Sequence, residues 1–465
     1  MEEIKKLYEE AFGRAPACTV RLAGAGGDRV YFRLYDEEGG SVIGVRGDSL
    51  RDNRAFAGLS GVFRAAGVPV PEIYKVSDDG MCYLEEDLGD VSLFTLLGSA
   101  EGEELVAQAM RSLAGMQSLP RREWEGLAAY PAFSRRQVMW DLNYFKYEFL
   151  KPTGVAFDED ALEDDFERLA DRLTGGRALQ GFMYRDFQSR NVMVRDGKVY
   201  FIDYQGGRLG PVVYDAVSFL WQAKARFTDA FRRTMLDLYA EELSRLVSAY
   251  SKEDILADVD MFALFRTLQV LGAYGFRGLV EKRAHFIESI PYALGNLGEL
   301  LERESIEGLP ELERVCREIC RCRRFAADGH EGLLVKVFSF SYKKGYPEDL
   351  TGNGGGFMFD CRGMHNPGRY EEFKPLTGRD RPVIDFLRDR GEADAFADKA
   401  LELVAPTVEC YLRRGFSDLQ IGFGCTGGRH RSVYCAERVA RALAARYPAA
   451  KVLLIHREQG IREEV

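Results

Sequence analysis

The chain has 465 residues and a net charge of −10, with 46% hydrophobic and 29% charged residues. This length exceeds what one compact core fills, so we expect two or three domains. No apolar run is long enough to span a bilayer and the opening residues 1–6 form no signal peptide, which excludes a membrane protein and predicts a cytoplasmic one. The nine scattered cysteines fit reduced thiols in that compartment.

The first segment predicts a short helix within residues 1–16, followed by strands at 18–23, 29–35 and 41–46. The turn between the first two strands is rich in glycine, which lets backbone N–H groups approach nucleotide phosphates. The candidate phosphate-binding residues are Gly24, Gly26, Gly27 and Asp28 in this turn and Arg46 at the end of the third strand. A plain flexible hairpin and a solvent-facing arginine are the alternatives.

A helix at 51–66 and strands at 73–76 and 81–85 follow, and the pattern from residue 92 to about 324 is mainly helical. In the helix expected at 137–150, the apolar stripe predicts core packing. The aromatic and acidic residues on its other faces, among them Trp140 and Asp141, could line a sugar site or form a solvated surface.

Within this helical region, residues 184–205 form the segment that we predict to carry the catalytic residues. It reads as a loop that presents Asp186 and Asn191, an apolar hairpin with Asp-Gly at its turn, and Asp203 where the returning strand ends. The set suits phosphoryl transfer, in which Asp186 accepts the proton of an attacking hydroxyl while Asn191 and Asp203 hold Mg²⁺ against the nucleotide phosphates. An ordinary hairpin with a solvated aspartate at each end is the alternative.

The order and spacing of Asp186, Asn191 and Asp203 resemble those of the protein-kinase-like superfamily, most closely its aminoglycoside phosphotransferase branch. The resemblance implies an α+β protein-kinase-like two-lobed domain, with a small β lobe at 1–90 and a large helical lobe at 91–325, that uses ATP and Mg²⁺. It further implies that Glu86 lies at the hinge that meets adenine and that Asp215 braces the catalytic loop. The nearest match is to the anomeric N-acetylmuramate/N-acetylglucosamine kinases, which also tend to lack a lysine on the third strand.

Residues 331–465 predict an α/β domain, because expected strands at 333–341, 356–361, 419–423 and 452–456 alternate with helices at 382–390, 392–414 and 432–446. A glycine-containing loop between a strand and a helix start directs backbone N–H groups and the helix dipole at one spot, which predicts an anion site. The residues of this expected site are Cys425, Thr426, Gly427, Gly428, Arg429, His430, Arg431 and Ser432.

The same domain resembles the C-terminal domain of the RNase adapter protein RapZ over almost its whole length. The matching pieces are Ser339–Gly345, Phe359–Arg362, Asn366–Pro367, Pro375–Gly378, Gly424–Gly428, His430–Ser432 and His456–Arg457. The resemblance implies a domain that senses an amino-sugar phosphate and binds a small regulatory RNA. Because the chain ends at Gln459–Val465 without a basic tail, RNA is the weaker of these two partners.

The two resemblances together predict an ATP-dependent amino-sugar kinase of cell-wall sugar recycling, fused to a sugar-phosphate-binding domain. Two other functions stay open, a regulatory RNA adaptor with an inactive kinase fold and a kinase for aminoglycoside- or choline-like cations. Cys425 also stands six residues before Arg431, the spacing of cysteine phosphatases. That chemistry is a weaker alternative, because Gly424 replaces their usual histidine and no general acid is evident.

Overall fold

The computed structural model describes residues 1–22, 29–175, 179–303, 306–322, 333–347, 356–414, 416 and 418–465. The chain divides into two compact units, and each is described by itself. The first comprises Met1–Phe276 with Ser289–Arg324, and the second comprises Arg277–Glu288 with Phe325–Val465.

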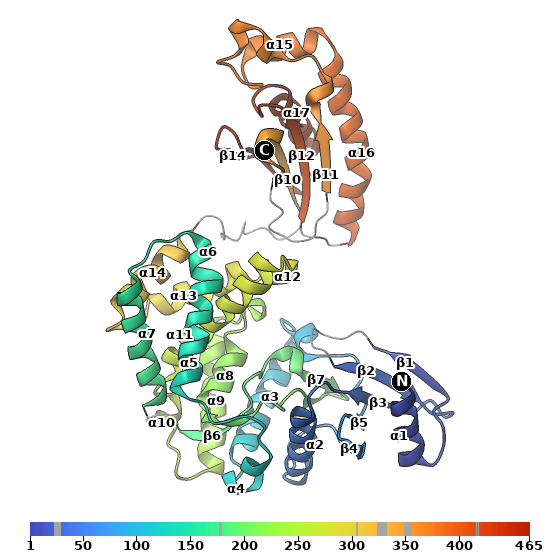
Figure 1. Cartoon of the computed structure of the whole chain (residues 1–465), viewed down its shortest axis with the longest axis vertical. Coiled ribbons are helices and arrows are strands. Elements are labelled where there is room, and N and C mark those ends of the chain that lie inside the picture. Colours follow the sequence, from blue (N-terminus) through green and yellow to red (C-terminus); the bar gives the residue numbers. More distant parts are fainter. Residues whose placement is uncertain are drawn as a thin grey trace. The chain divides into compact units, whose positions relative to one another are not determined.

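The first unit begins with a five-stranded antiparallel sheet in the order β1-β2-β3-β5-β4 (Figure 1). Its elements are α1 (Glu2–Phe12), β1 (Cys18–Arg21), β2 (Val30–Tyr35), β3 (Ser41–Arg46), α2 (Leu50–Ala65), β4 (Ile73–Val76) and β5 (Cys82–Glu86). Every strand and helix predicted here is present, with ends shifted by a few residues at most. Helix α1 packs on one face of the sheet, where Ile4, Leu7 and Tyr8 join alternate strand residues in a small core.

The rest of this unit is helical apart from two short strand pairs. The helices are α3 (Ala100–Gln117), α4 (Arg121–Trp124), α5 (Arg135–Phe145), α6 (Lys151–Thr153), α7 (Glu159–Thr174), α8 (Val213–Leu220), α9 (Asp229–Leu246), α10 (Lys252–Leu256), α11 (Val259–Tyr274), α13 (Ile290–Leu301) and α14 (Pro310–Cys320). Helix α11 packs against α5, α8 and α13 (Figure 1). The short helix α12 (Ala284–Ile287) groups with the second unit.

The strand pairs carry the predicted catalytic stretch. Strand β6 (Gln180–Met183) pairs with β9 (Arg208–Pro211), and β7 (Val192–Arg195) pairs with β8 (Lys198–Phe201). The predicted hairpin is confirmed, since Asp196 and Gly197 at its turn both have positive φ, as a two-residue turn between twisted strands requires.

The second unit contains a five-stranded sheet in the order β11-β12-β10-β13-β14, parallel except for β14. Its strands are β10 (Leu334–Ser341), β11 (Gly356–Asp360), β12 (Asp418–Cys425), β13 (Lys451–His456) and β14 (Ile461–Glu464), and its helices are α15 (Arg381–Asp389), α16 (Glu392–Arg414) and α17 (Arg431–Arg446). Helix α17 packs against β10, β12 and β13, and α16 packs beside α17 (Figure 1). The sequence missed β14, whose polar residues lack an apolar strand pattern.

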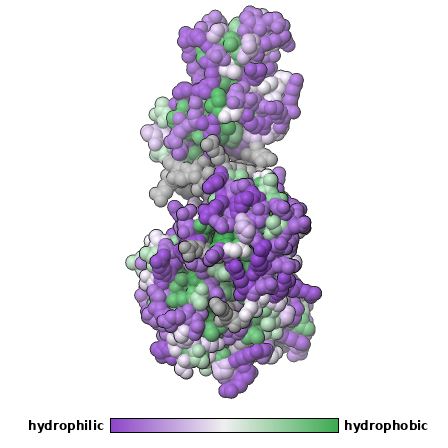
Figure 2. Space-filling model, turned by 90° about the vertical axis from the view of Figure 1, so that its left-hand side faces the viewer, coloured by the Kyte–Doolittle hydropathy of each residue, from purple (hydrophilic) through white to green (hydrophobic). Residues whose placement is uncertain are grey.

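Within the described ranges, no helix is long and apolar enough to cross a membrane. The molecular face in Figure 2 is correspondingly mostly hydrophilic, with hydrophobic residues in small separate groups.

Candidate active site and C-terminal ligand site

Helix α8 holds the N-terminal side of the catalytic loop through a buried carboxylate. Asp215 accepts hydrogen bonds from the backbone N–H groups of Tyr184 (2.7 Å) and Arg185 (2.8 Å) and from Nε2 of Gln117 (2.9 Å). Complete burial raises the pKa of Asp215 to about 7 although these donors oppose the rise. Arg185 has a φ of 79°, a conformation that side chains other than glycine rarely adopt, so the bonds to Asp215 fix a strained turn directly before Asp186.

The other end of α8 holds the far side of the same loop. Gln222, just beyond the helix, accepts hydrogen bonds through Oε1 from the N–H (2.9 Å) and the hydroxyl (2.7 Å) of Ser189. The loop that carries Asp186 is thus fixed at two points by one short, buried helix.

The structure brings together the three residues predicted to perform the chemistry. Asn191 donates through Nδ2 to the backbone carbonyl of Asp186 (2.9 Å) and to Oδ2 of Asp203 (3.5 Å). Asp203 also accepts a hydrogen bond from Nε2 of Gln205 (2.6 Å), while Asp186 is exposed. Burial first, and then the nearby Asp186 carboxylate, raise the pKa of Asp203, although Gln205 and Arg29 oppose the rise.

The donor set of this cluster fits a hard divalent cation. Mg²⁺ prefers oxygen ligands and is commonly held by one or two protein side chains together with water and phosphate oxygens. Asp203 offers carboxylate oxygens, and Asn191, anchored through its nitrogen, offers the amide oxygen. Within the described residues no cluster of three or more His, Cys, Asp or Glu side chains could replace this pair as a metal site.

The cation beside Asp203 is Arg29 and not the predicted Arg46. Arg29 Nη1 lies 3.8 Å from Asp203 Oδ1, and the arginine side chain is 13% exposed. Tyr83 and Tyr31 also face Arg29, and together with Asp203 they raise its pKa despite the opposing effect of burial.

Arg46 lies on the opposite face of the sheet, which corrects the prediction. It stands across from Val30 on β2 and Cys82 on β5, both part of the face covered by α1, and it forms an ion pair with Glu3 of α1 (3.4 Å). Because side chains alternate between faces along a strand, the position that faces Arg29 and the catalytic hairpin is Val45, which lies opposite Tyr31 and Tyr83.

Of the other residues predicted to bind the nucleotide, the structure describes only Glu86. Gly24, Gly26, Gly27 and Asp28 lie outside the described residues. The Glu86 carboxylate forms an ion pair with Arg195 (2.5 Å), and its backbone N–H donates to the carbonyl of Glu72 (2.8 Å). The Glu86 N–H is therefore already used, and the predicted contact with adenine would have to involve the Glu86 carbonyl. This contact remains a prediction.

A second polar network, which the sequence only partly indicated, lies beside Asp186. Asp141 on α5 is 2% exposed, so it is not the solvated surface residue that was the alternative, and it accepts a hydrogen bond from Nε2 of Gln269 on α11 (2.7 Å). Arg266, one turn earlier on α11, donates to Oε1 of Gln269 (2.5 Å). Trp140, by contrast, is 62% exposed and stacks on Tyr144 with ring centroids 5.3 Å apart.

In the second unit, the predicted anion loop lies at the carboxyl edge of the parallel strands, where ligands bind in open α/β sheets. Cys425 ends β12, and its Sγ lies 3.1 Å from the hydroxyl of Ser432 and accepts the N–H of Gly428 (3.2 Å). Burial alone would raise the pKa of the Cys425 thiol, but the bonds from Ser432 and Gly428 and the charge of Arg431 lower it.

The three basic side chains of this loop have different roles. Arg431 is buried and donates to the carbonyls of Arg362 (2.9 Å) and Met364 (2.8 Å), and His430 Nε2 donates to the carbonyl of Phe373 (2.9 Å). Only Arg429 is exposed together with Thr426 and Gly427. The expected second arginine for an anion therefore donates through Nη1 to the backbone of its own domain, while its buried Nε has no hydrogen-bond partner among the described residues. The engagement of Nη1 weakens the cysteine-phosphatase alternative.

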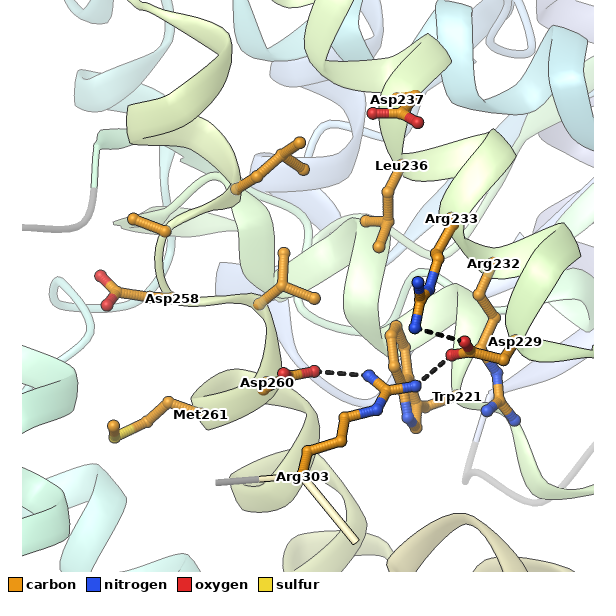
Figure 3. A pocket seen from close by; sticks show the side chains of 13 residues that line it. Trp221, Asp229, Arg232, Arg233, Leu236, Asp237, Asp258, Asp260, Met261 and Arg303 are labelled. Carbon is orange, nitrogen blue, oxygen red and sulfur yellow. Dashed lines mark hydrogen bonds and ion pairs between the residues drawn. The ribbon is translucent and has the colours of Figure 1, made fainter. Parts of the chain in front are cut away.

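A pocket of about 590 Å³ lies among α9, α11 and the end of α13, in the helical part of the first unit (Figure 3). Several of the charged side chains that line it pair with one another. Arg303 lies between Asp260, at 2.6 Å, and Asp229, which also pairs with Arg233 at 2.8 Å. None of the predicted phosphotransfer residues lines this pocket.

Comparison with known protein families finds a match in each of the two units. Residues 19–250 match the model of the phosphotransferase enzyme family, and residues 333–460 match the RapZ C-terminal domain. Residues 19–250 of the first unit and residues 333–460 of the second are therefore similar to these two families. The phosphotransferase domain has the protein-kinase-like fold, with a β lobe and a helical lobe, and the RapZ C-terminal domain is α/β with a mixed sheet, as the sequence predicted.

Individual relatives match over limited parts. A nucleotide-binding protein of Geobacillus thermodenitrificans is 39% identical over 142 residues, which are 30% of this chain and 45% of that protein. One of Cereibacter sphaeroides is 44% identical over 120 residues, covering 26% of this chain and 38% of that protein. The chain thus spans less than half the length of these curated relatives.

Solved structures similar to this chain include two kinases. Choline kinase LicA from Streptococcus pneumoniae has a TM-score of 0.46 and 10% identity, covering 65% of this chain and 99% of that one. An ethanolamine kinase of Plasmodium vivax has a TM-score of 0.44 and 12% identity, covering 63% and 84%.

The site residues that sequence reasoning missed are Arg29, Gln222 and Arg266. Arg29 begins a stretch in which Arg29, Tyr31 and Arg33 alternate with Val30, Phe32 and Leu34. This two-residue period already separates a polar face from the face that packs on α1, so it could have identified Arg29. No sequence signal marks Gln222 or Arg266, because Ser189, which contacts Gln222, and Tyr214, which contacts Arg266, lie far away in the chain.

Proposed function

We propose that this chain is an ATP- and Mg²⁺-dependent kinase that phosphorylates a hydroxyl group of an amino sugar. The observation that carries the proposal is the meeting of Asp186, Asn191 and Asp203 at one loop fixed by α8. Neither an inactive adaptor nor an ordinary hairpin requires a strained loop that polar side chains brace at both ends.

Each residue has a distinct role in the proposed transfer. The acceptor oxygen forms a bond to the γ-phosphorus as the bond from that phosphorus to the β,γ-bridging oxygen breaks, and Asp186 takes the acceptor's proton. Asn191 and Asp203 would hold Mg²⁺, which supplies charge neutralisation for the nucleotide phosphates. Arg29, adjacent to Asp203, adds a fixed positive charge at the same place.

For the acceptor, we propose N-acetylmuramate or N-acetylglucosamine, phosphorylated at the anomeric oxygen in cell-wall sugar recycling, in the cytoplasm. The proposal draws on the resemblance to the anomeric kinases and on the fused RapZ C-terminal domain. At that domain we propose that the exposed Thr426, Gly427 and Arg429 bind the phosphate group of a sugar phosphate at the start of α17.

The test is transfer of labelled phosphate from ATP to free sugars by the full chain, with acid lability of the product reporting an anomeric phosphate. Asp186→Asn should abolish transfer without changing the melting temperature. Asp196→Asn is the matched control, because Asp196 lies at the hairpin turn with a φ of 53° that asparagine also tolerates. Near-normal transfer by Asp186→Asn would disprove the assigned base, and salt-dependent RNA binding without any transfer would favour the adaptor.

A further inference from the structure

The catalytic hairpin has its candidate metal ligands at one end and Arg195 near the other. Strand β7 begins directly after Asn191, and β8 ends two residues before Asp203. The N–H of Ile202 closes this end by donating to the carbonyl of Asn191 (3.1 Å). Arg195 is the last residue of β7, about 10 Å along the strand from Val192. Because two paired strands move together, a contact at Arg195 influences the orientation of the end that carries the metal ligands.

Arg195 binds the segment that leads from the β lobe to the helical lobe. This segment comprises residues 86–90 and begins where β5, the last strand of the five-stranded sheet in chain order, ends. Arg195 donates through Nη1 to the backbone carbonyl of Asp87 (2.9 Å) and pairs through Nη2 with Oε1 of Glu86 (2.5 Å). The side chains of Arg195 and Glu86 are 33% and 16% exposed, so water and salt screen this pair only in part.

The β lobe holds the same connecting segment through β2. Arg33 donates through Nη2 to Oδ1 of Asp87 (3.0 Å) and to Oδ1 of Asp90 (2.9 Å). The hydroxyl of Ser41 on β3 donates to the other oxygen of Asp87, Oδ2 (2.7 Å). Asp87 therefore receives two arginines, Arg33 from the β lobe at its carboxylate and Arg195 from the catalytic hairpin at its carbonyl.

Other bonds keep the hairpin folded and attached without Arg195. The N–H of Val194 donates to the carbonyl of Val91 (2.8 Å), and the N–H of Phe201 donates to the carbonyl of Pro69 (2.8 Å). Gln108 of α3 accepts the N–H of Val199 through Oε1 (2.7 Å). Loss of the Arg195 side chain should therefore leave the fold intact and remove the link between the hairpin and Asp87.

We propose that Arg195 is a positioning residue, which aligns the metal-binding end of the hairpin with the phosphates of a nucleotide bound between the lobes. The inference rests on the proposed phosphotransfer and adds a residue to it. Asn191 and Asp203 would supply the ligands of Mg²⁺, and Arg195 would orient them through the connecting segment. Since phosphoryl transfer depends on alignment, a displacement of about 1 Å is enough to slow it.

The experiment measures ATP-dependent transfer by the full chain to the N-acetyl sugar that the natural chain uses. Arg195→Gln should lower kcat about tenfold and raise the half-saturating Mg²⁺ concentration about fivefold, because the metal ligands lose their alignment with the phosphates. KM for the sugar should change by less than about twofold, since Arg195 contacts the connecting segment and not the acceptor.

Three further variants separate positioning from stability. Arg195→Lys keeps the charge but not the two donors of the fork, so it should recover only part of kcat and of the Mg²⁺ affinity. Adding Glu86→Gln to Arg195→Gln should change kcat by less than about a further twofold, because both substitutions break the same pair. Arg245→Gln on α9 is the matched control, since Arg245 is exposed and pairs with its helix neighbour Glu242.

Each outcome decides the matter. An unchanged kcat and an unchanged Mg²⁺ dependence in Arg195→Gln would overturn the inference and leave phosphotransfer standing. A lower melting temperature with lower kcat, but with the natural Mg²⁺ dependence, would show an arginine that only stabilises the fold and would overturn it too. Absence of ATP-dependent transfer by the natural chain would instead refute the proposed function, and the inference with it.

Discussion

Arg29 Nη1 lies 3.8 Å from Asp203 Oδ1, so the start of β2 meets the end of the catalytic hairpin through a charge pair. The two residues are far apart in the sequence, and each belongs to a different lobe of the phosphotransferase domain. A nucleotide whose phosphates approach Asp203 must therefore also approach Arg29. This relationship leads to the first of four predictions.

Arg29→Gln should raise KM for ATP by about tenfold, because a fixed charge beside the phosphates is lost, while KM for the sugar changes little. Arg46→Gln provides the direct comparison, since Arg46 lies on the α1 face and pairs with Glu3. Steady-state kinetics with ATP as the varied substrate measure both. A larger effect at Arg46 than at Arg29 would contradict the placement of the two faces.

Asp215→Asn should destabilise the domain by about 2–4 kcal/mol, because an amide group would replace a buried carboxylate that accepts bonds from the N–H groups of Tyr184 and Arg185. It should also lower kcat by about a hundredfold, since Asp186 would lose its fixed position. Urea unfolding and kinetics measure the two effects. Asp171→Asn on the exposed face of α7 should change stability by less than about 0.5 kcal/mol.

The stability of the β lobe should fall as the pH rises, because of Glu85. Burial raises the pKa of this carboxyl to about 8, and Arg29 opposes the rise only in part. In the unfolded chain Glu85 loses its proton near pH 4.3, at about its reference value. Because the folded protein binds this proton more tightly than the unfolded chain does, the proton on Glu85 stabilises the fold. This stabilisation is complete below about pH 4.3 and is lost progressively as the pH rises to about 8.

Glu85→Gln should therefore stabilise the protein more at pH 9 than at pH 5, by about 2–4 kcal/mol, since glutamine needs no proton to remain neutral. Thermal unfolding at pH 5, 7 and 9 shows the difference as a flatter pH dependence of the first transition. An equal change in melting temperature at all three pH values would argue against a protonated Glu85.

Ser432→Ala should make Cys425 less reactive at neutral pH, because the hydroxyl group next to its sulfur stabilises the thiolate. The rate of Cys425 alkylation, followed by mass spectrometry of its peptide, should rise at higher pH in the variant than in the natural chain. The exposed Cys18 gives an internal reference within each sample. Unchanged pH profiles would show that Ser432 does not control the thiol.

The sequence predicted much of the fold because its signals are local. The Asp196-Gly197 turn, the strand that ends at Arg46 and the amphipathic α17 each follow from residues within a few positions of one another. The arrangement of Asp186, Asn191 and Asp203 is likewise local, since one hairpin connects the loop that carries the first two residues to the third.

The site features that the sequence did not predict depend on contacts between distant segments. The choice between Arg29 and Arg46 turns on which sheet face α1 covers, and that face is set by packing. Arg431 appeared free to bind an anion, yet the carbonyls that it contacts belong to residues 362 and 364. The burial of Asp141 similarly arises from the packing of α11 against α5.

The two ends of α8 support the reactive loop, whereas Asp141 and Arg266 belong to α5 and α11. The loop that carries Asp186 and the buried polar pair beside it thus rest on different helices. Substitutions on α5 and α11 should therefore alter that pair while both anchors of the loop stay in place.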